Sequence, residues 1–143
     1  MSSQPNLSPF EPEDRRKHLD HIQGVITRLS QSSATAKGWS LTIAGAAFGF
    51  ATLNQRWYLS LLGLAVIAAF SILDMNYLYQ ERLFRCLYSD VATGTIPPYS
   101  MDKDRFRGQA SRRKTYVSWS VLGFYLPLAL AGMIVVGLAL LTD

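Results

Sequence analysis

The spacing of apolar residues becomes helical from Pro12 onward. If residues 12–34 form a helix, five apolar side chains share a stripe about 120° wide and polar side chains occupy the opposite side. These five residues are Leu19, Ile22, Val25, Ile26 and Leu29. The pattern predicts an amphipathic helix over 12–34. The proline- and serine-rich residues 1–11 are expected to form a flexible tail, and they lack the apolar stretch of a signal peptide.

Long stretches of the remaining chain contain no charged residue. They are residues 38–55, 57–73 and 115–142. Mostly apolar, uncharged runs of about 18 residues or more are typical of membrane-spanning helices. The sequence therefore predicts three transmembrane helices. Their expected boundaries are 35–53, the first part of 56–92, and 115–141.

The second of these helices does not end where its apolar run ends. Helical spacing of apolar residues continues past Gln80 to Val91, so we expect one long helix over 56–92 that extends out of the membrane. Glu81 and Arg85 would form an i,i+4 ion pair on this extension. Gly94 should end the helix, and residues 93–114 would form a basic connector to the third span, which Pro127 should kink.

The distribution of positive charge predicts an orientation. Residues 1–37 contain five Lys and Arg, residues 80–115 contain eight, the turn at Arg56 contains one, and the residues after the last span contain none. Because Lys and Arg accumulate on the cytoplasmic side of spans, we expect a multi-pass membrane protein with a cytoplasmic N-terminus and an external C-terminus. The predicted class is an all-α membrane protein with three transmembrane helices, a cytosolic amphipathic helix and a long second helix that extends into the cytosol.

Asp74 is the residue whose position most calls for a chemical explanation. A carboxylate inside a span costs about 3 kcal/mol on insertion scales, so such residues usually face protein or water. One interpretation is a polar intramembrane path formed by Asp74 with Ser71 and Asn76. The other places Asp74 near headgroup depth, hydrogen-bonded to Tyr77, Asn76 or a basic residue of the connector.

Small residues suggest where helices approach each other closely. Gly45 and Gly49 have the small-xxx-small spacing that allows close helix packing in lipid. They would pack either against another helix of the same subunit or against a second subunit. A homo-oligomer is expected in either case, because three spans bury little area within one subunit and a polar residue in a span prefers a protein neighbour.

Other candidate chemistry is sparse. His18, His21 and Asp14 would lie along one helix face, which could begin a metal site, but no fourth ligand has a suitable spacing and packing accounts for His18. Cys86 is the single cysteine, so an internal disulfide is excluded. We find no phosphate loop and no set of nucleophile, base and acid. The sequence thus predicts a protein that is not an enzyme and needs no cofactor.

The net charge of +4 comes from residues that flank the spans. This position favours contact with membrane lipids over binding of nucleic acid, for which no module is present. The residues expected to meet anionic headgroups are Arg105, Arg107, Arg112, Arg113 and Lys114.

Residues 15–92 resemble the SLATT group of small bacterial membrane proteins. The resemblance rests on residues 16–23 (RKHLDHIQ), 37–40 (KGWS), Leu73 with Asp74, and 80–85 (QERLFR). It implies an amphipathic cytosolic helix, a two-span hairpin and a cytosolic helical extension. It also implies a location in the bacterial inner membrane and a pore-forming or membrane-perturbing effector of bacterial conflict or phage defence, triggered by a partner or a nucleotide signal. The span at 115–141 departs from this two-span layout.

Two functions follow as hypotheses. The first is an oligomeric effector that permeabilises or depolarises the inner membrane, with Asp74 and the small-residue face of the first span on its path. The second is a non-catalytic membrane anchor or scaffold whose cytosolic helices dock a soluble partner through Arg82 and Arg85. The expected partners are membrane lipids, further copies of the chain, and a soluble protein partner or a nucleotide-triggered sensor.

Overall fold

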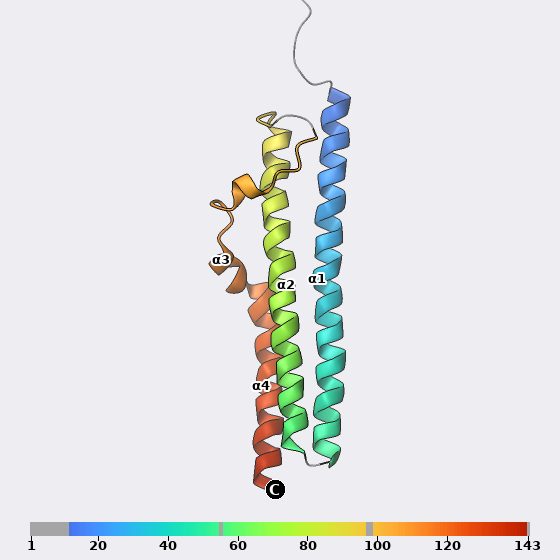
Figure 1. Ribbon diagram of the computed structural model, residues 1–143, viewed down its shortest axis with the longest axis vertical. Coiled ribbons are helices and arrows are strands. Elements are labelled where there is room, and N and C mark those ends of the chain that lie inside the picture. Colours follow the sequence, from blue (N-terminus) through green and yellow to red (C-terminus); the bar gives the residue numbers. More distant parts are fainter. Residues whose placement is uncertain (1–11, 55, 97–98, 143) are drawn as a thin grey trace, which may run out of the picture.

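The structure is a computed structural model, which describes residues 12–54, 56–96 and 99–142. All regular elements of the described residues are helical, as the sequence predicts. The expected tail at 1–11 lies outside the described residues. Two long antiparallel helices and a shorter third one lie side by side along one axis (Figure 1).

The first helix, α1 (Pro12–Asn54), runs unbroken through both the expected amphipathic helix and the expected first span. Proline stands at its first position, where a missing N–H costs nothing, and no proline follows until the helix has ended. The second helix, α2 (Trp57–Ala92), corresponds to the long helix expected over 56–92. Gly94 follows it with φ of 77°, the left-handed conformation that closes a helix.

The expected third helix is divided in two. The chain passes through a short 3₁₀ turn, η1 (Asp104–Phe106), and a single helical turn, α3 (Arg112–Tyr116), before α4 (Trp119–Thr142) begins. The backbone N–H of Ser118 donates to the Thr115 carbonyl at 3.2 Å, and that of Val121 donates to the Ser118 carbonyl at 3.0 Å. A turn therefore separates α3 from α4. The apolar helix therefore starts at Trp119 and not at the expected residue 115. It continues through Pro127 without interruption.

Two separate hydrophobic cores lie along the bundle. The first joins the N-terminal half of α1, the C-terminal half of α2 and the connector, and its largest fully buried members include Ile22, Leu83 and Leu87. The second joins all three long helices around Phe48, Ile67 and Tyr125. We call residues 12–34 with 75–111 the stalk, and residues 38–54, 57–73 and 119–142 the apolar half.

Two helices are long and apolar enough to cross a membrane. Their most apolar windows have mean hydropathies of 2.0 in α2 and 2.3 in α4. Only 22% and 17% of these windows is buried inside the chain, so most of their apolar surface faces outward. α1 does not reach the same hydropathy, because its C-terminal half is rich in glycine, alanine, serine and threonine.

Candidate functional site at the border between the two halves

Asp74 lies fully buried on the face of α2 that packs against α1. Its Oδ2 lies 2.7 Å from Nζ of Lys37, and its Oδ1 accepts a hydrogen bond from the hydroxyl of Ser33. Lys37 Nζ also donates to Ser33 Oγ at 3.0 Å. One turn of α1 thus supplies both a positive charge and a hydroxyl to the carboxylate, because residues four apart lie on the same helix face.

The third helix reaches the same cluster. The hydroxyl of Tyr125 in α4 donates to the carbonyl of Phe70 at 3.3 Å, one turn before Asp74 in α2. Tyr125 is itself buried in the second core. The carboxylate thus receives a cation and a hydroxyl from α1, which compensate the cost of burying it.

The pair also occupies a defined place along the bundle. No charged residue follows Lys37 in α1 and none precedes Asp74 in α2. The cluster therefore lies at the border between the stalk and the apolar half. A pair at this place fixes the register of α1 against α2, because sliding either helix by one turn would leave a buried charge without its partner.

The polar path expected from three residues of α2 does not form as a common face. Ser71 donates its hydroxyl to its own helix, at the Ala68 carbonyl 2.8 Å away, and Asn76 is exposed. Only Asp74 points into the bundle. The prediction that Asp74 bonds to Tyr77, Asn76 or a basic residue of the connector was wrong. Its partners are Lys37 and Ser33, which α1 supplies.

Glycines divide into two groups by what surrounds them. A Cβ at Gly45 or Gly49 would meet nothing within 4 Å among the described residues, so this pair faces away from the bundle. Close packing inside the chain instead uses Gly63 of α2 and Gly132 of α4. A Cβ at either position would lie within 3 Å of the ring of Phe48, which fills the space between them.

His18 holds the connector onto α1. Its Nδ1 accepts the Tyr99 N–H at 3.2 Å, so Nε2 carries the proton and donates to the Ser100 carbonyl at 3.0 Å. Both ring nitrogens are thus occupied by backbone. The described residues contain no group of three His, Cys, Asp or Glu that could hold a metal ion. The hydroxyl of Tyr99 donates to Asp14 at 2.9 Å, and this bond to a carboxylate raises the pKa of Tyr99 above 10.0.

The basic residues of the connector have different surroundings. Arg105 is exposed, Arg107 pairs with Asp104 at 3.0 Å, and the Arg112 guanidinium lies 4.9 Å from the centre of the Tyr79 ring. The side chains of Arg113 and Lys114 lie outside the described part of the chain.

The two arginines expected to contact a partner lie on the stalk. Arg85 is exposed and donates to Glu81 at 2.7 and 2.8 Å, which is the expected i,i+4 pair. Arg82 is half-buried.

The sequence interpretation missed Lys37 as part of this site because it counted Lys37 with the basic residues before the first span. One signal was available: Lys37 ends the charged part of α1 just as Asp74 begins that of α2. In an antiparallel hairpin with its turn near residue 55, these two residues lie at similar distances from the turn.

Comparisons with protein-family models, with curated proteins and with solved structures give no match to this chain.

Proposed function

We propose that the chain is a bacterial inner-membrane protein that crosses the bilayer three times and acts as a homo-oligomer to permeabilise that membrane. The carrying observation is the surface of the apolar half. It has no charged residue, and several of its large apolar side chains, among them Leu62, Ile134 and Leu138, are more than half exposed. A soluble protein rarely exposes so much contiguous apolar surface.

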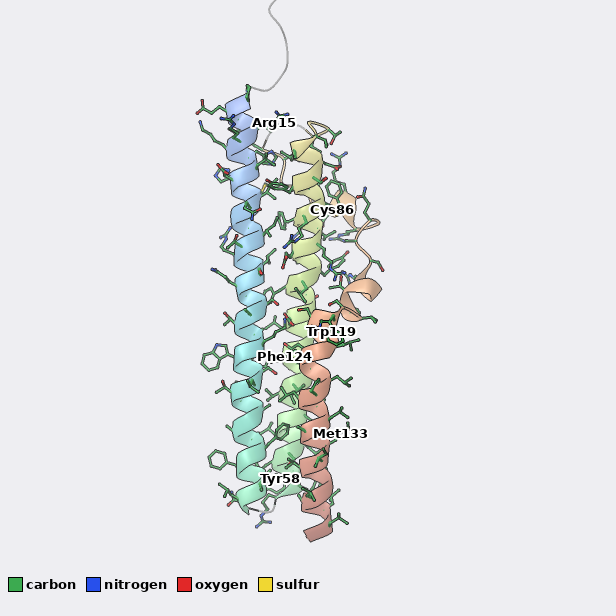
Figure 2. The ribbon with its side chains drawn as sticks, turned by 180° about the vertical axis from the view of Figure 1, so that it is seen from behind. Arg15, Tyr58, Cys86, Trp119, Phe124 and Met133 are labelled. Atoms are coloured by element: carbon green, nitrogen blue, oxygen red, sulfur yellow. The ribbon has the colours of Figure 1, made fainter. Side chains whose placement is uncertain are left out.

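The aromatic residues support a membrane position for this half. Trp57 and Tyr58 begin α2 at one end of the apolar half, and Trp119 begins α4 at the other end. Figure 2 shows Trp119 and Tyr58 at these two levels. Trp and Tyr favour the two interfaces of a bilayer. Residues 57–73 span about 25 Å as a helix, close to the hydrocarbon thickness of about 30 Å.

The C-terminal half of α1 would be the third span, although it is less apolar than the other two. One exposed face carries large apolar side chains, among them Trp39, Ile43 and Phe50. The hydroxyls of Thr42 and Thr52 bond to carbonyls of their own helix at 3.0 and 2.9 Å, so they carry little polar cost into lipid.

A second exposed face of α1 supports the oligomer and the path. Five small residues share a stripe about 80° wide on the helix. They are Gly38, Thr42, Gly45, Gly49 and Thr52. The three glycines have open space where a Cβ would stand. Such a face offers weak contact to lipid and close approach to another helix, so α1 helices of several copies would meet or surround a path there.

Ion flux across liposomes that contain the purified chain tests this function. We expect flux from the wild type and its loss when Gly45→Leu and Gly49→Leu are combined, because leucines would fill the small-residue face. The control is Gly137→Leu, at a glycine of α4 that is equally open. Flux that survives the double substitution, or that the control abolishes equally, would contradict the role of this face.

A second candidate function is a membrane anchor that docks a soluble partner. The stalk favours it, because it has its own core of large side chains and exposes charged residues such as Arg85. Reversal of charge with Arg82→Glu and Arg85→Glu would then abolish partner binding. An effector that needs no such partner would keep its flux in this variant.

A further inference from the structure

A groove of about 440 Å³ runs between α1 and α2 on the outside of the bundle. Its α1 wall extends from Arg28 to Trp39, which is about 16 Å along a helix. Its α2 wall is formed by Phe70, Leu73 and Tyr77. The groove therefore passes the level of Lys37 and Asp74, where the stalk meets the apolar half.

The chemistry of the groove changes from one end to the other. The stalk end offers the guanidinium of Arg28 with the polar side chains of Gln31 and Ser32. The other end is formed by Trp39 and Phe70, and Trp39 is 56% exposed. A ligand that fits this gradient has an anionic group at one end and an apolar chain at the other.

Arg28 is available to such a ligand. It is exposed, and none of the ion pairs between described residues includes it. Two carboxylates of neighbouring α2 turns are already engaged: Asp74 pairs with Lys37, and Glu81 pairs with Arg85. The cation at the polar end of the groove thus lacks an anion from within the described chain, and an arginine binds phosphate well through its fork of N–H donors.

We propose that this groove binds one anionic phospholipid, with the phosphate at Arg28 and an acyl chain along Trp39 and Phe70. The inference rests on the membrane position in the proposed function, which puts the Trp39 end of the groove at the border of the bilayer and Arg28 on the water side of that border. A free phosphate would leave the apolar end of the groove empty. A lipid fills both ends, and the bilayer supplies it at high local concentration.

Tryptophan quenching by brominated lipids tests this assignment, since bromine quenches only at close range. The chain has three tryptophans, so Trp57→Phe with Trp119→Phe leaves Trp39 as a reporter at the groove. Two vesicle preparations of phosphatidylcholine are compared. One contains brominated phosphatidylglycerol and the other contains brominated phosphatidylcholine, and in both lipids the bromine lies near the headgroup end of the acyl chains. We expect about a five-fold preference of the Trp39 site for the anionic lipid, the size given by one basic residue at a membrane surface.

Matched variants separate the groove from general attraction to an anionic surface. Arg28→Gln should remove the preference, whereas Arg16→Gln, at an exposed cation outside the groove, should retain it. Equal quenching by the two lipids, or equal effects of the two substitutions, would overturn the proposal. Displacement by glycerol 3-phosphate, which carries the anion without the chain, would overturn the lipid as the occupant.

A second reporter distinguishes failure of the groove from failure of the membrane position. Trp39→Phe with Trp57→Phe leaves Trp119, which is 89% exposed at the start of α4 and outside the groove. Quenching of Trp119 by both lipids shows insertion, and a missing preference at Trp39 then overturns the lipid site alone. No quenching of Trp119 by either lipid would overturn the membrane position, and the lipid site with it.

Discussion

The stalk and the apolar half are built largely from the same two helices but distribute their hydrophobic residues oppositely. In the stalk, large side chains such as Ile22 and Leu87 are fully buried, and the exposed large apolar residues of its described part are Tyr88, Tyr99 and Met101. In the apolar half, small residues such as Ala44 and Ser60 are fully buried, while many leucines and isoleucines, such as Leu62 and Ile134, face outward. This difference is the one expected if the stalk faces water and the apolar half faces lipid, as proposed above, because water drives large apolar groups inward and lipid does not.

The border between the two regions depends on one ion pair, and breaking it should have the largest effect. We expect Lys37→Met to destabilise the fold by about 4 kcal/mol, because Asp74 would be left buried without its cation. Asp74→Leu should cost a similar amount. Combining the two should restore most of the loss, since no charge then remains unpaired. Thermal unfolding followed by circular dichroism in a mild detergent measures all three variants, and additive losses in the double variant would contradict this account.

A smaller but still large effect should distinguish the interiors of the two regions. Leu87→Ala removes a fully buried side chain of the stalk and should cost about 3 kcal/mol. Ile134→Ala, at a residue of α4 that is 64% exposed, should change the same free energy by less than about 0.5 kcal/mol. Denaturant titration of the two variants measures the contrast. Equal losses would mean that Ile134 is covered and that the apolar half is not outward-facing.

Within the apolar half, glycines on opposite faces should respond differently. Gly63→Ala puts a methyl group 2.5 Å from Cε1 of Phe48 and should cost about 1–3 kcal/mol through overpacking. Gly49→Ala meets open space and should be neutral or stabilising for the isolated subunit, because alanine favours a helix. Phe48→Leu should rescue Gly63→Ala. Unfolding of the three variants provides the check, and no rescue would show that Phe48 does not occupy the space beside Gly63.

The smallest effect concerns the connector at the end of the stalk. Since its bond to Asp14 raises the pKa of Tyr99 above 10.0, the contact is intact below pH 10 and is lost as the pH rises through the raised value. Asp14→Asn should move the ionisation of Tyr99 back towards its ordinary pKa. The difference in tyrosinate absorbance between chains with Tyr99 and with Tyr99→Phe isolates this group, and an unchanged titration would contradict the bond.

The sequence by itself determined the helical class, the extent of α2 beyond its apolar run and the pair of Glu81 with Arg85. These features follow from the period of apolar residues and from contacts four residues apart, which are local properties of a helix. The start of α4 could not be predicted from the sequence, because residues 115–118 are uncharged like the helix that follows. Only a turn at Ser118 separates them.

The tertiary structure alone decided which residues meet across helices. It paired Asp74 with Lys37 and Ser33 of α1, placed Phe48 between Gly63 and Gly132, and turned Gly45 and Gly49 outward. The physical reason is rotation: a hydrophobic period defines a helix but, where every face is apolar or small, it does not say which face turns towards a neighbour. The orientation of each helix depends on how the three helices pack together and on the pairing of the buried Asp74 carboxylate with Lys37.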